Sequence, residues 1–255
     1  MKIAAQLYTI RDFTGNAGQV EESLKKIRGI GYRAVQVSGF KHYDAALIAG
    51  VCKSIGLEIA VTHTPLARII DDTENVINEH KLFGAGYVGL GSYKMQSQKD
   101  CADFIKLMEK PVERFYKAGL KFVYHNHAHE FVMDGGMTVM DYFLQNTDPR
   151  KTGLLADLYW LQFAGVNPAA FLEKYKDRIE IVHLKDMKII RDGEGKHVQT
   201  FAEVFGGNMD YGNILDVCKK TGVRYAAVEQ DVCPADPFDS LKISFDNIKA
   251  RGFIE

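Results

Sequence analysis

Four hydrophobic segments in the second half of the chain each run into side chains that can bind a divalent metal. They are residues 122–130, 154–157, 181–183 and 226–229. Each has the character of a buried strand that ends in a carboxylate or an imidazole. Such ends can converge on one ion only if the carboxyl ends of the strands meet at the same rim, as they do in a closed parallel barrel. This placement constrains the fold more than any other feature of the sequence.

Short apolar or β-branched runs recur along the whole chain at intervals of roughly 25 to 45 residues, the spacing of repeated β-α units. We predict eight strands, at residues 3–8, 34–38, 58–63, 87–91, 121–125, 153–158, 179–184 and 225–229. Apolar residues between them recur at helical spacing, as in Val20, Leu24 and Ile27. A glycine expected to end each helix precedes five of the strands, at Gly31, Gly56, Gly86, Gly119 and Gly222.

This alternation predicts an α/β protein with a single (β/α)8 barrel, one domain over residues 1–255. The rival architecture is a doubly wound open sheet, which usually carries a glycine-rich phosphate turn after its first strand. Residues 7–16 contain no such turn. The longest irregular stretch, residues 186–213, is rich in glycine and charge and is expected to form a loop over the active rim.

The charge balance excludes some classes of partner. Lys plus Arg number 32 against 33 Asp plus Glu, so the chain lacks the basic excess that nucleic-acid or anionic-membrane binding requires. The expected partner is a small molecule. The first twelve residues hold no long apolar run, which argues against a signal peptide or membrane span, and we expect a cytoplasmic protein. The four cysteines are scattered, as is typical of reduced thiols, and no disulfide is expected.

Three of the strand ends offer one clear ligand each. Glu229 ends the apolar run at 225–228, and Asp157 and His183 interrupt otherwise buried sequence. Any one of these could be an ordinary polar strand end. A buried carboxylate or imidazole needs a partner, however, and several together favour a functional site.

The fifth strand offers five candidates within six residues: His125, Asn126, His127, His129 and Glu130. They cannot all bind one ion. Alternation along a strand places the three histidines on one face and Asn126 on the other, until the strand turns near Glu130. Some of these side chains are therefore expected to pack or hydrogen-bond around the site instead of binding the ion.

A ligand set of up to three carboxylates and one imidazole is hard and rich in oxygen. It favours Mn²⁺ or Mg²⁺, and it also admits Co²⁺ or Zn²⁺. An ion with open positions can bind the hydroxyl and carbonyl oxygens of a sugar, polarise the carbonyl group and acidify the neighbouring C–H bond. A carboxylate or histidine beside it can then move the proton.

At these residues the chain resembles the sugar phosphate isomerase/epimerase family, the xylose isomerase-like TIM barrels that include inosose dehydratases and ketose 3-epimerases. The resemblance covers nearly the whole chain. It is carried by the segments QLY at 6–8, YHNH at 124–127, DLYW at 157–160, HLKD at 183–186 and VEQD at 228–231.

The resemblance implies a metal held by Glu130, Asp157, His183 and Glu229, with His125 or His127 as alternatives to Glu130 as the first ligand. It also implies that Glu130 and Glu229 carry protons on opposite sides of the substrate. Further catalytic candidates are Lys185 and His127. We predict substrate contacts for His63, Trp160, His125, Gln36 and Asn126.

Two residues depart from the family pattern. Many members carry a glutamate where this chain has Gln36, at the end of the second strand, and a histidine where it has Trp160. The first change removes a potential acid or base. The second offers an apolar face on which a sugar ring can stack.

The resemblance implies a metal-dependent isomerase, epimerase or dehydratase-type lyase that acts on a keto-sugar, inosose or related polyol, and pairing of two copies as a homodimer. The alternative is a non-catalytic sugar-binding barrel or partner subunit. An apurinic endonuclease-like phosphodiesterase fits less well, because a net charge of −1 gives no basic face for DNA.

Overall fold

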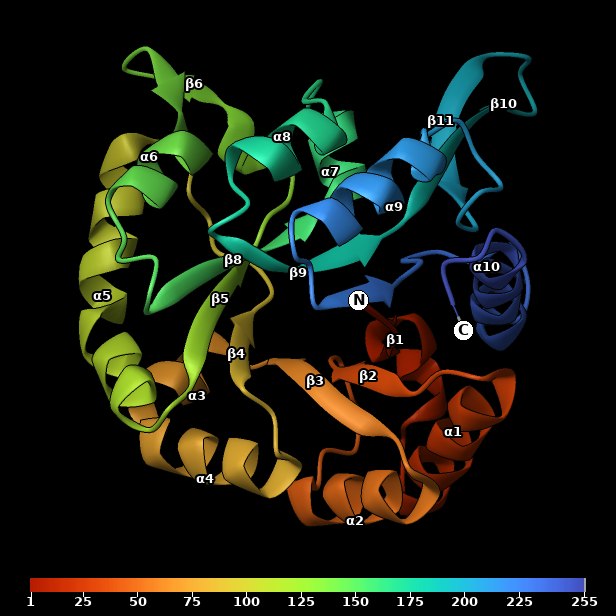
Figure 1. The fold of residues 1–255 in the computed structure, drawn as a ribbon, viewed down its shortest axis with the longest axis horizontal. Coiled ribbons are helices and arrows are strands. Elements are labelled where there is room, and N and C mark those ends of the chain that lie inside the picture. The colour runs from red at the N-terminus through yellow and green to blue at the C-terminus, as the bar shows by residue number, and fades with distance from the viewer. Residues whose placement is uncertain (255) are drawn as a thin grey trace.

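Eight parallel strands close into a barrel in the computed structural model, which describes residues 1–254 (Figure 1). The order around the barrel is β1-β12-β9-β8-β5-β4-β3-β2. The barrel strands are β1 (Lys2–Gln6), β2 (Ala34–Val37), β3 (Glu58–His63), β4 (Tyr87–Leu90), β5 (Lys121–His125), β8 (Thr152–Asp157), β9 (Ile179–Leu184) and β12 (Tyr225–Val228). Each predicted strand is found, so the predicted (β/α)8 barrel is confirmed.

Helices surround this ring of strands and cover its outer face (Figure 1). They are α1 (Ala17–Ile30), α2 (Ala45–Ile55), α3 (Leu66–Asp71), α4 (Thr73–Phe83), α5 (Gln98–Lys117), α6 (Val139–Gln145), α7 (Leu158–Phe163), α8 (Pro168–Lys174), α9 (Tyr211–Lys220) and α10 (Pro237–Ala250). Two short 3-10 helices, η1 (Leu7–Phe13) and η2 (His129–Phe131), follow β1 and β5. None of the helices among residues 1–254 is long and apolar enough to cross a membrane.

The glycine at the end of α4 is not the predicted one. Gly84, with φ +65°, ends this helix in the left-handed conformation and donates its backbone N–H to His80 and Lys81. Gly86 lies two residues later and has no positive φ. The sequence places both glycines directly before β4, and only the backbone conformation distinguishes which one ends the helix.

The barrel interior is filled by side chains from alternating positions of the strands, as expected of a packed barrel. Small and branched residues such as Ala4, Val61, Leu155 and Ile181 form this layer. A larger apolar cluster fills the space between the strands and the helices. Because the interior is packed, a ligand that binds within the ring of strands is expected at a mouth of the barrel.

The segment predicted to be an irregular loop, residues 186–213, contains a hairpin. Strands β10 (Asp186–Arg191) and β11 (His197–Ala202) pair antiparallel, and a smaller hairpin, β6 (Met133–Asp134) and β7 (Met137–Thr138), follows β5. Both project beyond the ring of strands, at the upper left and upper right of Figure 1. The alternation of polar and apolar residues in 186–202 is a strand signal that the glycine content concealed.

The hairpin is closed at its base by hydrogen bonds and rests on helix α7. The buried carboxylate of Asp186 accepts hydrogen bonds from the backbone N–H groups of Met187, Gly207 and Met209. Nearer the site, the ring of Phe201 stacks on Tyr159 of α7 with centroids 4.6 Å apart. The segment predicted to be a loop over the rim is thus a hairpin that contacts α7 beside the rim.

Candidate active site

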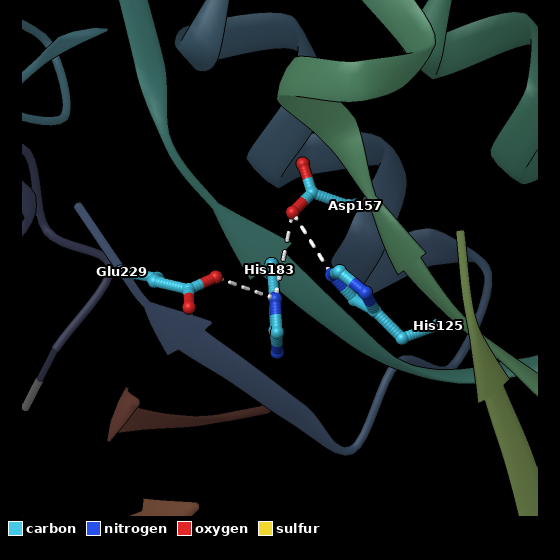
Figure 2. Close-up of side chains that lie close together, drawn as sticks. All are labelled: His125, Asp157, His183 and Glu229. Atoms are coloured by element: carbon cyan, nitrogen blue, oxygen red, sulfur yellow. Dashed lines mark hydrogen bonds and ion pairs between the residues drawn. The ribbon is translucent and has the colours of Figure 1, made fainter. Parts of the chain in front are cut away.

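Four side chains from consecutive strands of the barrel converge at the carboxyl ends of those strands. They are His125, Asp157, His183 and Glu229, from the ends of β5, β8, β9 and β12, and each offers a ligand atom within 4.8 Å of the others (Figure 2). All four are buried. His183 lies at the centre, with its Nδ1 atom 3.0 Å from Glu229 Oε2 and 3.5 Å from Asp157 Oδ2.

The outward nitrogens of the two histidines are already engaged. His125 Nδ1 lies 2.8 Å from the carbonyl oxygen of Gly91, which can only accept, so this nitrogen carries the proton. His183 Nε2 lies 2.7 Å from Gln36 Oε1, again an acceptor. In the neutral rings, the lone pairs of His125 Nε2 and His183 Nδ1 therefore point at the carboxylates.

This arrangement fits a divalent cation. A lone pair facing a carboxylate is unfavourable unless a positive charge lies between them, either a proton or a metal. His183 Nδ1 is in fact buried without a hydrogen-bond partner, although Glu229 Oε2 is near. A set of two imidazoles and two carboxylates, each held by an outer hydrogen bond, is the chemistry of a Mn²⁺, Co²⁺ or Zn²⁺ site.

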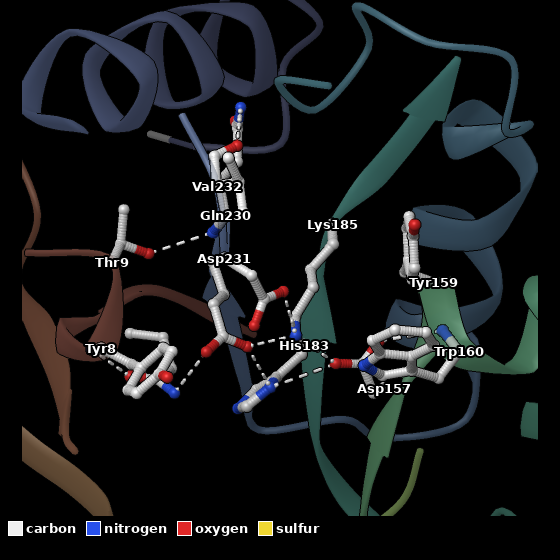
Figure 3. Close-up of polar contacts among 12 residues, drawn as sticks. Tyr8, Thr9, Asp157, Tyr159, Trp160, His183, Lys185, Gln230, Asp231 and Val232 are labelled. Carbon is white, nitrogen blue, oxygen red and sulfur yellow. Dashed lines mark hydrogen bonds and ion pairs between the residues drawn. The ribbon is translucent and has the colours of Figure 1, made fainter. Parts of the chain in front are cut away.

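Lys185, in the segment after β9, brings a positive charge to the same oxygens (Figure 3). Its Nζ atom lies 2.7 Å from Glu229 Oε2 and 2.9 Å from both Asp157 Oδ2 and Asp231 Oδ2. The residue is 1% exposed. An ammonium group surrounded by three carboxylates is well paired, and it neutralises charge that would otherwise oppose folding.

The electrostatics of the cluster set the protonation states. Burial alone would raise the pKa of Asp157, but Lys185, His125 and His183 outweigh it and hold this pKa well below its usual range. Burial is likewise outweighed at Glu229, whose pKa is lowered by Lys185 and His183. Burial opposes the charge of His183, but Glu229 and Asp157 prevail and raise the pKa of this imidazole.

Glu130 does not join the cluster, which corrects its predicted place as a ligand beside Asp157, His183 and Glu229. Its carboxylate accepts hydrogen bonds from Tyr124 Oη at 2.6 Å and from the backbone N–H of His127 at 2.9 Å, and it lies 3.2 Å from His129 Nε2. The chain turns after β5, and η2 directs this side chain behind the strand. His125, one of the two alternatives in the sequence, takes the place in the cluster.

Two residues predicted to contact substrate support the cluster from behind. Asn126 is fully buried and accepts a hydrogen bond from the backbone N–H of Asp157 at 2.9 Å through its Oδ1 atom. Gln36 is fully buried against His183. Neither lines the cavity described next. Polar side chains this deeply buried are expected to be hydrogen-bonded within the protein, and both of these position a residue of the cluster.

A cavity of about 420 Å³, here called the reaction cavity, opens beside the cluster. Among the predicted site residues, those that line it are His63, His125, His127, Lys185 and Glu229. Trp160 is half-buried next to it, with its ring 5.5 Å from that of His127 and 5.9 Å from Lys185 Nζ.

The reaction cavity also contains residues that were not predicted: Gln6, Tyr8 and Asp231. Gln6 Nε2 donates to Glu229 Oε1 at 2.7 Å. Asp231 follows Glu229 by two residues, and this spacing places alternate residues on the same face of an extended segment. All three also fall in the segments QLY at 6–8 and VEQD at 228–231 that carry the family resemblance, which is the signal that could have identified them.

The raised pKa of His183 predicts how stability depends on pH without metal. A pKa raised above the unfolded value of about 6.5 gives stabilisation that is complete below that pH and is lost as pH rises through the folded pKa. The lowered pKa values of Asp157 and Glu229 act at the other end, and their stabilisation is lost as pH falls below about 4. Urea unfolding of metal-free protein should therefore show declining stability above about pH 6.5.

The variant His183→Asn should flatten this alkaline decline. The matched control is His197→Asn, which changes an exposed histidine of β11 and should leave the decline unchanged. Excess Mn²⁺ should reverse the trend for the natural chain, because a metal displaces the imidazole proton and binds more tightly as pH rises. A decline of equal size in His183→Asn and in the natural chain would contradict the assignment.

Comparison with known proteins supports the fold and the family. Residues 24–232 match the family model described as xylose isomerase-like TIM barrel. Inosose dehydratase from Clostridium tetani is 27% identical over 172 residues, which is 62% of this chain and 55% of that protein. The chain thus spans about half the length of the curated relatives that it matches.

Solved structures match over the whole chain. A sugar phosphate isomerase/epimerase from Parabacteroides distasonis has a TM-score of 0.82 at 21% identity, with 100% of this chain and 96% of that one covered. D-allulose 3-epimerase from Methylomonas sp. has a TM-score of 0.73 at 13% identity, with 98% of both chains covered. At these identities the structures show a shared barrel fold.

Proposed function

This chain belongs to the xylose isomerase-like TIM barrel family, and from that premise we propose that it is a sugar enzyme of the isomerase, epimerase or dehydratase type. Its substrate is a keto-sugar, an inosose or a related polyol. The reaction begins with removal of a proton from the carbon next to the carbonyl group. The curated relatives, which are inosose dehydratases, support this class.

The observation that carries the proposal is the convergence of His125, Asp157, His183 and Glu229 beside a cavity of about 420 Å³ at the carboxyl ends of the strands. This is the end of a (β/α)8 barrel at which active sites are found. A divalent cation held by these four residues supplies Lewis-acid polarisation of the substrate carbonyl when it is bound.

Lys185 contributes a fixed positive charge at the edge of the reaction cavity. Its ammonium group is held by Asp157, Glu229 and Asp231, so its position is set before substrate arrives. A preorganised donor of this kind stabilises negative charge that develops on a substrate oxygen as the neighbouring proton leaves.

Asp231 is the best-placed group to take that proton. It lines the reaction cavity, and burial together with the charge of Glu229 raises the pKa of its carboxyl group. A base is most effective when its pKa lies near the working pH, which favours Asp231 over Glu229, whose pKa is lowered. His127 also lines the cavity, but burial lowers its pKa to about 3, so it is a neutral and weak base.

Exchange of substrate protons with solvent tests this proposal. Protein loaded with Mn²⁺ is incubated in D₂O with inososes and keto-sugars, and deuterium uptake is followed by NMR together with metal content. Exchange is expected with Mn²⁺ and not with chelator. Asp157→Asn should lose both metal and exchange, whereas Asp231→Asn should keep the metal and lose exchange by about 100-fold or more.

The control for both variants is Asp216→Asn, which changes an exposed carboxylate of α9. It should behave as the natural chain does. Exchange that persists in chelator and in Asp157→Asn would contradict the proposal.

A second candidate function is a sugar-binding barrel without catalysis. It is favoured by Lys185, which already neutralises the oxygens of Asp157 and Glu229 that a metal would use. In that case the purified protein should bind a keto-sugar, take up no stoichiometric Mn²⁺ and catalyse no deuterium exchange.

A further inference from the structure

A second cavity of about 220 Å³, here called the outer compartment, adjoins the reaction cavity. The two share part of their lining, namely Ser38, Gly39, His63, Thr64 and Pro65. The two cavities therefore lie side by side, and together they are called the recess. The larger part alone lies in the size range of ligand pockets, which is about 300–1,000 Å³. A ligand that fills both parts must have one chemical group in the reaction cavity and a second group in the outer compartment.

His63 stands in the wall between the two parts. Its ring centroid lies 5.0 Å from that of His125 and 5.5 Å from that of His183, so the outer compartment begins next to the cluster. Its Nδ1 atom lies 3.3 Å from Ser38 Oγ, and its Nε2 atom is buried without a partner. A group attached to a sugar at the cluster can pass directly along this ring.

The outer compartment presents a fixed aromatic face. Tyr43, which is 42% exposed, donates its hydroxyl hydrogen to Glu79 Oε2 at 2.7 Å. Arg68 lies 5.7 Å from the centroid of the Tyr43 ring, and Glu79 and Asp72 hold its guanidinium group. The Tyr43 ring is thus held by Glu79 at its hydroxyl group and by contact with the guanidinium group of Arg68. Phe40 and Pro65 add further apolar lining.

Neither part has a free cation for an anionic ligand. Among the described residues that line the two parts, the only lysine or arginine side chains are Lys185 and Arg68. Lys185 is paired with three carboxylates, and Arg68 with two. A phosphate group requires free donors or positive charge, and the reaction cavity instead contains Glu229 and Asp231. The recess therefore suits an uncharged ligand.

We infer that the substrate is an uncharged glycoside whose sugar ring carries a ketone, with this reacting ring in the reaction cavity and an aromatic aglycone against Tyr43 in the outer compartment. This inference rests on the proposed function and deepens it, because it names the substrate class of the same site. A flat apolar ring gains contact with a tyrosine that is already held in position, so little ordering opposes binding.

Binding of simple glycosides to the natural chain tests the inference without any need for turnover. The probes are the methyl and phenyl glucosides of both anomers, cellobiose, glucose and glucose 6-phosphate, measured by calorimetric titration. A phenyl glucoside should bind about tenfold more tightly than the corresponding methyl glucoside. Glucose 6-phosphate should bind no better than glucose.

The variant Tyr43→Ala should remove the preference for the phenyl glucoside and leave methyl glucoside binding unchanged, whereas Tyr43→Phe should keep the preference. The matched control is Tyr116→Ala on α5, because Tyr116 is also 42% exposed and lies outside both parts of the recess. Thermal melts of each variant establish that it is folded.

Several outcomes would overturn the inference: equal binding of phenyl and methyl glucosides, a preference that survives Tyr43→Ala, tighter binding of cellobiose than of either phenyl glucoside, tighter binding of glucose 6-phosphate than of glucose, or no binding of any glycoside. Failure of the proposed function looks different. It appears as an absence of deuterium exchange in keto-sugars, whether or not phenyl glucosides are preferred.

Discussion

Replacing Glu229 by glutamine is expected to reduce turnover by about 10³-fold or more and to leave the barrel folded. Glu229 Oε2 lies 3.0 Å from His183 Nδ1 and 2.7 Å from Lys185 Nζ. Glutamine preserves the shape and can still accept from Gln6, but it removes the negative charge that both neighbours face. Metal affinity should fall by more than the roughly 10–100-fold that loss of an outer hydrogen-bond partner costs.

The matched control is Glu180→Gln. Glu180 lies on the neighbouring strand β9, pairs with Lys121 and Tyr87, and belongs to the amino-terminal half of the barrel strands. The same chemical change there should leave turnover and metal content unchanged. Steady-state kinetics and metal analysis measure both variants. Normal turnover of Glu229→Gln with a keto-sugar substrate would remove Glu229 from the site.

Replacing Lys185 by methionine is expected to destabilise the metal-free protein by about 3–5 kcal/mol, because three buried or partly buried carboxylates then lose the ammonium group that pairs with all of them. For a chain of this size the melting temperature should fall by about 10 °C. Mn²⁺ at about 1,000 times its dissociation constant should restore roughly 4 kcal/mol, since the ion supplies the missing charge.

The stabilisation by Mn²⁺ should be larger in Lys185→Met than in the natural chain, where the ammonium group and the ion compete for Asp157 Oδ2 and Glu229 Oε2. The control is Lys121→Met. Lys121 pairs with one carboxylate, Glu180, at 2.8 Å and is partly exposed, so its loss should cost about 1 kcal/mol or less. Equal melting temperatures for metal-free Lys185→Met and the natural chain would refute the charge argument.

The positions of the strands could be predicted because a buried strand appears in the sequence as a short run of apolar residues. A strand such as 179–184 is apolar enough to be recognised without its neighbours, and the polar residue near its carboxyl end, His183, marks the rim. Asp157 and Glu229 were found in the same way, and the structure places both beside His183.

Glu130 was misplaced because it lies beyond the end of β5, where strand periodicity no longer applies. Three residues of loop are enough to turn its side chain behind the strand, toward Tyr124. His125 is the last residue of β5, and its direction follows from the alternation that the sequence displays. Asn126 and Gln36, predicted to contact substrate, are instead hydrogen-bonded to Asp157 and His183 and do not line the reaction cavity.

The sequence by itself determined the alternation of strands and helices, the closure into a barrel and the polar ends that meet at one rim, since these depend on the local pattern of apolar residues. Only the tertiary structure decided that His125 joins Asp157, His183 and Glu229, that Lys185 lies among three carboxylates and that Tyr43 faces a compartment beside them. Such contacts join residues far apart in the chain. They depend on packing across the barrel and on the paths of the loops that follow the strands, which a local pattern of apolar residues does not fix.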